Sequence, residues 1–448
     1  MSFARYPTYK NSGVEWLGEI PDHWSLQPLK QQFQIVGGST PKSDVDDFWD
    51  GDVAWATPAD LGKGDTWYIA ATQRRITKSG LQSCAAMLVP ANSIVLSTRA
   101  PIGSLGITTV PMCTNQGCRS LIPSSSTCTD FFAYMLSIAT DELMLRGKGT
   151  TFLELSGNEL GAFRVSVPPL CEQTMISTFL AGETAKIDAL IAEQLRLIEL
   201  LKEKRQAVIS HAVTKGLNPD APMKPSGVEW IGDVPSHWQV FPLHRLVQSR
   251  RRITYGIVQP GEPDEHGRFM IRGQDYSSAW AAPSAIFRVS DAIETPYKRA
   301  RLMHGDLVIT IVGAGVGNIA VVPEWLEGAN ITQTTARIAI DPDKADATYV
   351  AAVLSGPIGR RSVELFAKGA AQPGLNLEHV RIFSVTVPPI VEQRAIAGFI
   401  IRETAAFDSL AEAAERAITL LQERRTAMIS AAITGKIDVR NYVASQAA

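Results

Sequence analysis

An internal repeat constrains the fold of this chain more than any other feature of its sequence. The run SGVEWLGEIPDHW, residues 12–24, recurs 214 residues later as SGVEWIGDVPSHW, residues 226–238. A second, longer run that starts at Phe163 recurs 220 residues later, starting at Phe383. Solenoid repeats have periods of roughly 20–50 residues, far shorter than this one. We therefore predict two copies of one large unit.

Between these two repeated runs the copies diverge, and only a loose correspondence survives. WATPADL around Asp60 matches IRGQDY around Asp275, and VLSTRAPIG, 95–103, matches VITIVGAGVG, 308–317. The divergent stretches predict a variable globular segment in each copy, followed by a similar long helix. Such a chain can hold two different binding surfaces on one kind of scaffold.

Composition places the chain among globular proteins. Of its 448 residues 45% are apolar and 20% are charged, which suits two or three ordinary domains. No apolar stretch approaches the ~20 residues that span a bilayer, and the start lacks the apolar core of a signal peptide. We expect a cytoplasmic protein without a membrane partner. The net charge of −2 means that any nucleic-acid surface must be local or shared with a basic partner.

Signatures of enzymes and metal sites do not occur. The five cysteines form no CxxC pair, so no metal site is predicted. The double prolines lack the Asp or Asn that begins the catalytic motif of amino-methyltransferases, and no GxxxxGK(S/T) loop exists. The third glycine of a GxGxxG loop would fall on Asn318, so Gly313, Gly315 and Gly317 indicate a tight turn. We predict no catalytic residue.

A helix of about 45 residues should follow each double proline, Pro168-Pro169 and Pro388-Pro389, because no internal proline interrupts these stretches. Heptad spacing predicts a coiled-coil seam in both. Its residues are Leu180, Ile187, Leu190, Leu197, Leu201 and Val208 in the first helix, and Ile400, Phe407, Leu410, Leu421 and Met428 in the second.

Polar positions recur within the seam and indicate its direction. Glu183 corresponds to Glu403, and Lys204 corresponds to Arg424. An antiparallel pair would bring an acidic site near a basic one, which favours that orientation. The alternative is that each helix packs on its own globular domain.

Three sets of residues carry a family resemblance: SGVEWLGEIPDHW, the VPP(L/I)xEQ entry to each helix, and the endings KEKRQAVISHAVTKGL and QERRTAMISAAITGKI. The chain resembles, over essentially its whole length, the specificity subunits of type I restriction-modification systems. The resemblance implies two target-recognition domains that each read half of a bipartite DNA site, with an antiparallel coiled coil fixing the distance between half-sites. It also implies double-stranded DNA, two methyltransferase subunits and restriction (motor-nuclease) subunits as partners, with S-adenosylmethionine, ATP and Mg on those partners and no cofactor in this chain.

The predicted fold is α+β, with two globular target-recognition domains joined by two long antiparallel coiled-coil helices in a pseudo-two-fold repeat. The predicted segments are target-recognition domain 1 at 1–165, long helix 1 at 166–218, target-recognition domain 2 at 219–385, long helix 2 at 386–440 and a C-terminal tail at 441–448. Because the two variable domains differ, the DNA site should be asymmetric.

Residues for DNA contact should be basic or amide side chains of the variable domains, since arginine suits guanine or phosphate and amides suit adenine. The candidates are Thr40, Arg74, Arg75, Lys78, Arg99 and Gln116 in the first domain, and Arg250, Arg251, Arg252, Gln259, Arg272, Gln274, Arg299, Arg301 and Gln333 in the second. The rival hypothesis is a stand-alone DNA methyltransferase or nuclease with an unrecognised active site. A coiled-coil scaffold that does not touch DNA is a third.

Overall fold

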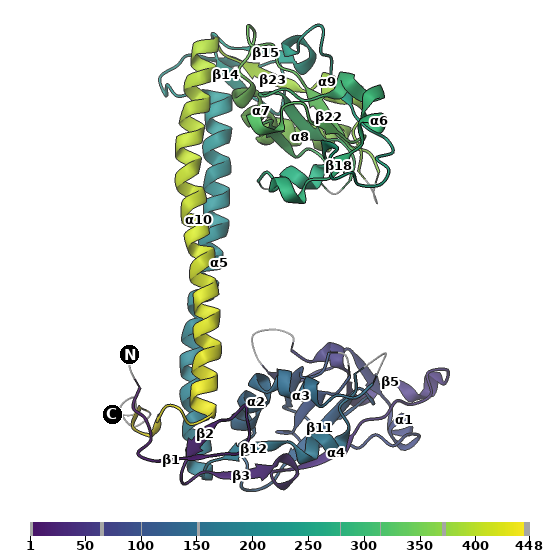
Figure 1. The fold of residues 1–448 in the computed structure, drawn as a ribbon, viewed down its shortest axis with the longest axis vertical. Coiled ribbons are helices and arrows are strands. Elements are labelled where there is room, and N and C mark those ends of the chain that lie inside the picture. Colours follow the sequence, from purple (N-terminus) through teal and green to yellow (C-terminus); the bar gives the residue numbers. More distant parts are fainter. Residues whose placement is uncertain are drawn as a thin grey trace. The chain divides into compact units, whose positions relative to one another are not determined.

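The computed structural model describes residues 3–62, 67–99, 101–149, 153–277, 279–313, 315–369 and 373–442. The chain divides into two compact units: unit 1 comprises residues 1–194 and 416–448, and unit 2 comprises residues 195–415. Each unit contains one globular body and part of both long helices, α5 (Leu170–Lys215) and α10 (Ile390–Ile433) (Figure 1). Among the described helices none is both long and apolar enough to cross a bilayer.

The body of unit 1 is built on a five-stranded and a three-stranded sheet. The larger has the order β4 (Phe33–Gly37), β11 (Cys118–Pro123), β8 (Ile94–Ser97), β9 (Leu105–Thr108), β6 (Tyr68–Ile69); the smaller has the order β10 (Met112–Thr114), β5 (Trp49–Ala56), β7 (Arg74–Ile76). Two ribbons pair β1 (Tyr9–Asn11) with β2 (Glu19–Pro21) and β3 (Ser25–Pro28) with β12 (Arg164–Val167). The short helices are η1 (Leu29–Gln31), η2 (Asp46–Phe48), η3 (Pro58–Asp60), α1 (Lys78–Gln82), α2 (Thr129–Ile138), α3 (Thr140–Leu145) and α4 (Gly157–Ala162).

The body of unit 2 has the same plan with shorter strands. Its main sheet has the order β16 (Thr254–Tyr255), β22 (Thr335–Ile338), β19 (Leu307–Thr310), β20 (Ile319–Val321), and its second sheet has the order β18 (Arg288–Val289), β17 (Arg268–Ile271), β21 (Asn330–Ile331). Two ribbons pair β13 (Met223–Pro225) with β14 (Asp233–Pro235) and β15 (Gln239–Pro242) with β23 (Ser384–Val387). The short helices are η4 (Leu243–Leu246), η5 (Gly273–Tyr276), η6 (Pro283–Ala285), α6 (Asp291–Glu294), η7 (Thr295–Ala300), η8 (Glu324–Leu326), α7 (Ala347–Ser355), α8 (Pro357–Phe366) and α9 (Leu377–Arg381).

Strand pairing confirms the repeat, including the loosely matched stretches. The parallel pair β5–β10 of unit 1 corresponds to the parallel pair β17–β21 of unit 2. Asp60 accepts a hydrogen bond from the backbone N–H of Thr57, and Asp275 accepts one from that of Arg272, both at 2.8 Å. In unit 2 the described glycines Gly313, Gly315 and Gly317 lie between β19 and β20, and Gly317 has a φ of +91°. No nucleotide-binding loop is needed to explain them.

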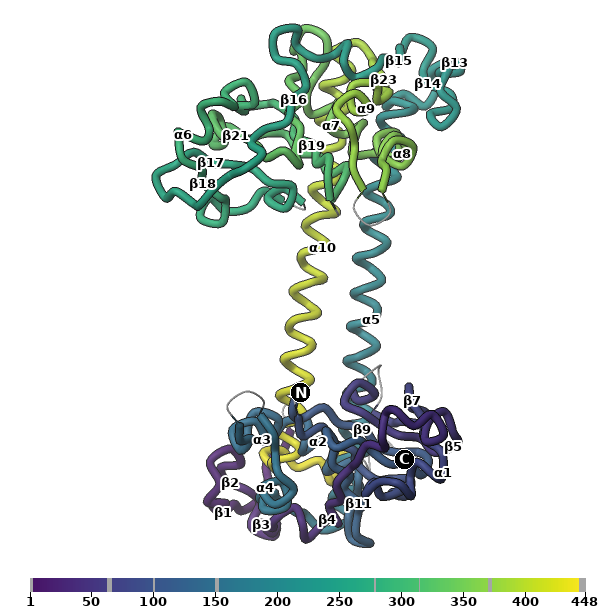
Figure 2. Tube along the Cα trace, turned by 90° about the vertical axis from the view of Figure 1, so that its right-hand side faces the viewer, coloured from purple at the N-terminus to yellow at the C-terminus, as the bar shows by residue number. Residues whose placement is uncertain are grey.

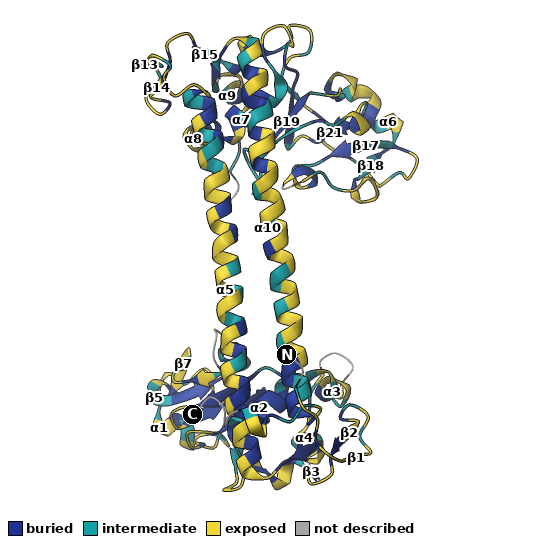
Figure 3. Ribbon diagram, turned by 90° about the vertical axis from the view of Figure 1, so that its left-hand side faces the viewer, coloured by how far each residue is buried: buried dark blue, intermediate teal, exposed yellow. Residues whose placement is uncertain are grey.

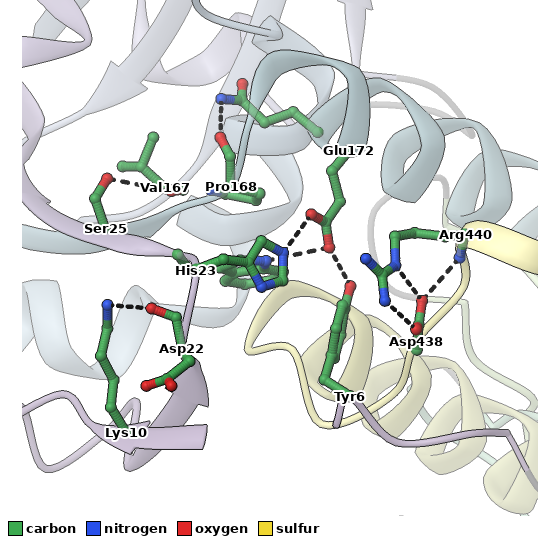
Figure 4. A network of polar contacts seen from close by, with 12 residues as sticks. Tyr6, Lys10, Asp22, His23, Ser25, Val167, Pro168, Glu172, Asp438 and Arg440 are labelled. Atoms are coloured by element: carbon green, nitrogen blue, oxygen red, sulfur yellow. Dashed lines mark hydrogen bonds and ion pairs between the residues drawn. The ribbon is translucent and has the colours of Figure 1, made fainter. Parts of the chain in front are cut away.

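A carboxylate in the first turn of each long helix holds the tryptophan motif of its unit. In unit 1, Glu172 accepts hydrogen bonds from the Trp24 indole at 3.1 Å, from His23 at 2.8 Å and from the Tyr6 hydroxyl (Figure 4). Burial, together with the bond to Glu172, raises the pKa of Tyr6. The motif therefore packs onto the helix through a buried acceptor that three donors share.

The equivalent contact in unit 2 has fewer donors. Glu392 accepts hydrogen bonds from His237 at 2.7 Å and from the Trp238 indole at 3.1 Å. Its side chain is 28% exposed, whereas that of Glu172 is 4% exposed. Trp24 and Trp238 are both fully buried, so the second tryptophan of each repeated motif is a core residue of its unit.

The glutamine that follows each glutamate ties the long helix to the main body. The side chain of Gln173 accepts from the backbone N–H of Cys128 and donates to the carbonyl of Pro168, both at 2.9 Å. Gln393 makes the same two bonds, to Asp346 and Pro388. Cys128 and Asp346 immediately precede α2 and α7. The EQ pair therefore fixes two elements of each unit against one long helix.

Within each unit α5 and α10 run side by side in opposite directions (Figure 2). In unit 1 the Arg425 guanidinium pairs with Asp188 at 2.9 Å, and in unit 2 Arg205 pairs with Asp408 at 3.3 Å. Asp188 and Asp408 are equivalent in the repeat, as are Arg205 and Arg425, so one ion pair occurs twice. This confirms the antiparallel coiled coil and contradicts helices that pack only on their own bodies.

Three of the eleven predicted seam positions are displaced by one residue. Leu180, Ile187, Leu201, Ile400 and Met428 are buried as predicted, and Val208, Phe407 and Leu421 are half-buried. The predictions for Leu190, Leu197 and Leu410 are wrong, because these side chains are 51%, 40% and 53% exposed.

The seam continues through the residue after each of these three, as in Ile198, which is 7% exposed. Figure 3 shows that buried positions recur along α5 and α10, which are otherwise largely exposed. Positions three and four residues along a helix share a face. Where two apolar residues are adjacent, as in Leu197-Ile198, spacing alone does not choose between them.

That adjacent pair provides a test of the seam. We expect Ile198→Ala to lower the free energy of unfolding by about 2 kcal/mol, because it removes buried contacts. Leu197→Ala is the matched control and should change it by under about 0.5 kcal/mol. Urea titration followed by circular dichroism measures both. Equal losses in the two variants would contradict the observed register.

The glutamates that hold the tryptophan motifs provide a second test. Glu172→Ala leaves three buried donors without their acceptor. We therefore expect it to lower the free energy of unfolding of unit 1 by about 3 kcal/mol. Glu392→Ala should lower the free energy of unfolding of unit 2 by about 1 kcal/mol, because this carboxylate is more exposed to solvent and has two donors. Hydrogen exchange of the Trp24 and Trp238 indoles measures each unit separately. A larger loss in unit 2 would contradict this assignment.

Candidate nucleic-acid interface

Four loops of unit 1 meet at the carboxyl ends of the parallel strands β5 and β10. The backbone N–H of Asn115 donates to Ala56 at 2.9 Å, that of Ser39 donates to Thr114 at 2.9 Å, and that of Thr98 donates to Gly117 at 2.8 Å. We call residues 38–42, 57–60, 98–99 and 115–117 recognition edge 1. Backbone bonds join these loops, so the side chains that take no part in holding them are free to vary.

The same backbone bonds build an equivalent edge in unit 2. Thr332 donates to Ile271 at 3.1 Å, Ile257 donates to Ile331 at 2.7 Å, and Ile311 donates to Thr334 at 2.8 Å. Residues 256–259, 272–275, 311–313 and 332–334 form recognition edge 2. Two loops approach so closely at each edge that a Cβ on Gly38 or Gly256 would overlap a backbone carbonyl. The sequence requires glycine there for space.

Recognition edge 1 brings together three of the predicted residues. Thr40 and Gln116 are exposed, and the Thr40 hydroxyl donates to the Gln116 side-chain oxygen. Arg99 is also exposed and pairs with Glu154 at 3.0 Å, a surface ion pair that phosphate can replace at little cost. Hydroxyl, amide and guanidinium groups on one edge are the groups that contact base edges and phosphates.

Two tryptophan side chains support the 38–42 loop from below. The Trp55 indole donates to the carbonyl of Ser39 at 2.9 Å, and the Trp49 indole donates to that of Lys42 at 3.1 Å. The guanidinium of Arg74 lies 3.8 Å from the centre of the Trp49 ring. Arg74 therefore lies beside this loop.

The other two candidates of unit 1 lie on neighbouring elements. Arg75, next to Arg74 on β7, donates to the carbonyl of Asp52 at 2.6 Å. Lys78 is exposed at the first residue of α1.

Recognition edge 2 presents three exposed glutamines, Gln259, Gln274 and Gln333. Gln333 occupies the position equivalent to Gln116, since each follows the residue that bonds to the end of the parallel strand. Arg272 lies on this edge but contacts its own unit: it bonds to Asp275 at 3.3 Å and lies 5.7 Å from the Phe287 ring centre.

The remaining arginines of unit 2 fall into two groups. Arg251 is bound to Asp306, and Arg301 is bound to Glu294, with two guanidinium–carboxylate bonds in each pair between 2.6 and 2.7 Å. Arg250, Arg252 and Arg299 are exposed, and none has an ion pair among the described residues. The first group stabilises unit 2, and the second is available to a ligand.

Three further residues at these edges escaped the sequence analysis. Lys42 is exposed in the loop that holds Thr40, and Gln73 is exposed where its backbone N–H donates to Asp60 at 2.8 Å. Arg119 lies on β11 against Gly37, and its buried Nε has no hydrogen-bond partner within the residues that the structure describes. Lys42 lies two residues after Thr40, so the loop-like sequence STPKSD could have indicated Lys42 as a further candidate for DNA contact. Only strand pairing brings Gln73 and Arg119 here.

Comparison with known proteins identifies this architecture. Residues 21–200 match the family model described as the type I restriction modification DNA specificity domain. The MjaIX specificity subunit of Methanocaldococcus jannaschii is 33% identical over 189 residues, and the EcoBI specificity subunit of Escherichia coli is 27% identical over 311 residues. The chain is therefore similar to the specificity subunits of type I restriction-modification systems.

The coverage of these relatives differs. The matches span 42% of this chain and 43% of the MjaIX subunit, and 68% of this chain and 65% of the EcoBI subunit. The EcoKI specificity subunit of Escherichia coli K12 is 20% identical over 434 residues, which cover 94% of this chain and 90% of that subunit. The resemblance inferred from the repeated runs is thereby confirmed.

Solved structures confirm the fold of a specificity subunit. A chain from a study of complex assembly and conformational transition of the type I R-M system has a TM-score of 0.69 at 12% identity, over 92% of this chain and 98% of that one. The HsdS subunit from Thermoanaerobacter tengcongensis has a TM-score of 0.51 at 13% identity, over 93% and 98%. At these identities the likeness concerns the fold. It supports two globular domains joined by long coiled-coil helices.

The buried Glu294 of unit 2 predicts a pH dependence of stability. The hydrogen bonds from Arg301 hold the pKa of Glu294 below its usual range. A lowered folded-state pKa stabilises unit 2 fully above the unfolded value of about 4.3, and this stabilisation disappears as the pH falls through the folded value. Thermal unfolding between pH 7 and pH 3 should therefore show a steeper acid loss in the native chain than in Glu294→Gln. Parallel profiles would contradict the ion pair.

Proposed function

We propose that this chain recognises a bipartite, asymmetric site in duplex DNA as the specificity subunit of a type I restriction-modification complex. One observation carries the proposal: recognition edges 1 and 2 share a backbone frame but differ in side chains. Where edge 1 has Thr40 and Arg99, edge 2 has Val258 and Val312. Two unlike surfaces on one repeated frame suit two unlike half-sites.

In this proposal the chain acts by binding duplex DNA. Phosphate contacts by arginine and lysine supply affinity, and amide or guanidinium contacts to base edges supply specificity. Methylation of a base requires the target nucleotide to leave the duplex stack and enter the pocket of an enzyme. In this proposal a methyltransferase partner provides that pocket, and this chain positions the partner on the site without an active site of its own.

The proposed partners follow from the relatives, which are named subunits of type I restriction enzymes. We propose two methyltransferase subunits, matched to the two repeats, and restriction subunits for cleavage. S-adenosylmethionine, ATP and Mg would then bind to those partners. A stand-alone methyltransferase or nuclease has no support among the relatives, which are all specificity subunits.

Two binding measurements test the proposal. The full chain, purified with its methyltransferase partner, should bind duplex DNA with strong salt dependence. The chain alone should not bind radiolabelled S-adenosylmethionine. A methylation map of a host that expresses both proteins should show one split, asymmetric motif modified on both strands. A continuous motif, or cofactor binding by the chain alone, would overturn the proposal.

The equivalent glutamines Gln116 and Gln333 test whether each edge reads one half-site. Loss of a good amide–base contact costs about 1–3 kcal/mol of discrimination, or about 5- to 150-fold. Gln116→Ala should relax the methylated motif at positions within one half-site, and Gln333→Ala should relax it within the other half. Gln422→Ala, an exposed change on α10, is the control and should leave the motif unchanged. Relaxation of both halves by either edge variant would contradict independent readers.

A further inference from the structure

The main sheet of unit 2 contains a fully buried arginine. Arg337 lies on β22, opposite Val308 of β19 and Thr254 of β16, and is 1% exposed. Burial of a guanidinium is costly unless other groups satisfy its donors and its charge. The corresponding position of unit 1 is Ser120, opposite Val95 and Val36, so the repeat itself does not require arginine here.

Among the described residues, Arg337 bonds only to backbone carbonyls. Its Nη2 donates to the carbonyl of Arg252 at 3.0 Å and to that of Arg299 at 3.2 Å, and its Nη1 reaches the carbonyl of Arg251 at 3.5 Å. Its Nε is buried and has no hydrogen-bond partner in the described part of the chain. Burial, with the nearby Arg251 adding to it, lowers the pKa of Arg337 to about 10, so the group stays charged at neutral pH. One buried cation therefore joins two segments, 250–252 and 298–303, that lie far apart in the sequence.

A second guanidinium joins the same two segments. Arg251 donates to both carboxylate oxygens of Asp306, at 2.6 and 2.7 Å, and to the carbonyl of Arg301 at 3.1 Å. Asp306 also accepts from the backbone N–H of Met303 at 2.8 Å. The inward-facing arginines thus determine where the backbones of both segments lie.

Four basic side chains of these segments remain exposed: Arg250, Arg252, Lys298 and Arg299. None of them has an ion pair within the described part of the chain. Gathering cations without counter-charges is unfavourable in the free protein, because like charges repel. A row of phosphates supplies the missing negative charge, and guanidinium groups suit it geometrically.

We propose that Arg337 is a positioning residue that holds segments 250–252 and 298–303 together, so that Arg250, Arg252, Lys298 and Arg299 form one phosphate-binding surface for duplex DNA. This inference rests on the proposed function and adds the residues that grip the backbone beside the second half-site. Arg337 touches no DNA in this assignment. It acts through the carbonyls that it bonds.

The test uses the full chain with its methyltransferase partner and a duplex of arbitrary sequence as the probe. Each phosphate contact contributes about 0.9 to the slope of log affinity against log salt. Arg337→Met should lower that slope by about 2 to 3 and weaken binding at 0.1 M salt by tens of fold. Arg337→Lys keeps a charged donor and should fall between Arg337→Met and the native chain. Arg361→Met, an exposed change on α8, is the control and should match the native chain.

A double-mutant cycle separates positioning from general stability. In the native background, Arg252→Ala with Arg299→Ala should lower the slope by about 2. In the Arg337→Met background the same two substitutions should change the salt slope little, because the two segments no longer hold their basic side chains together. Limited trypsin digestion gives a readout without DNA: cleavage after Arg252 and Arg299 should accelerate in Arg337→Met at an unchanged melting temperature.

The outcomes distinguish the two proposals. If the native complex binds no duplex, the proposed function fails, and faster trypsin cleavage still supports positioning by Arg337. If the native complex binds the duplex but a folded Arg337→Met variant keeps the native salt slope, the positioning role is overturned. Additive effects in the double-mutant cycle overturn it as well. If Arg337→Met does not fold, Arg337→Lys carries the same comparison, and a native slope there likewise overturns it.

Discussion

The contacts of the Glu-Gln pair in the first turn of each long helix are those on which the rest of the structure depends. Glu172 and Glu392 accept the indole of a buried tryptophan, and the following glutamine bonds to the backbone before α2 or α7. A buried acceptor that loses its donors is costly, so these bonds allow one arrangement of motif, helix and body. The repeat keeps this pair because it joins three elements of each unit.

The ion pairs between the two long helices specify direction more than they add stability. Asp188 with Arg425 and Arg205 with Asp408 are partly exposed ion pairs, each worth at most about 1 kcal/mol. In a parallel pair in register, the two aspartates would face each other, and so would the two arginines. The repeat thus turns one acidic and one basic position into attraction for the antiparallel pair and repulsion for the parallel one.

A backbone-built edge explains how one frame carries two different surfaces. The bonds that join the loops at recognition edges 1 and 2 run between main-chain groups, and glycine is needed only where loops approach closely. Side chains there can differ without loss of the frame. Unit 2 adds the buried Arg337, which Ser120 replaces in unit 1, so the units differ in their supporting residues as well as at the edges.

The sequence by itself determined the repeat, the two long helices, their direction and the equivalence of Asp60 with Asp275, because these follow from local spacing and recurrence. It also predicted Gln116 and Gln333 as candidates for DNA contact, and the fold places these two residues at equivalent positions. Tertiary structure decided which of Leu197 and Ile198 enters the seam, since both positions share a helix face with the heptad residue before them. It also decided which arginines are paired: Arg251 and Arg301 bond to carboxylates 55 and 7 residues away. Arg252 and Arg299 have no ion pair within the described residues. Whether a charge is paired depends on which strands and loops meet, and that pairing leaves no local pattern in the sequence.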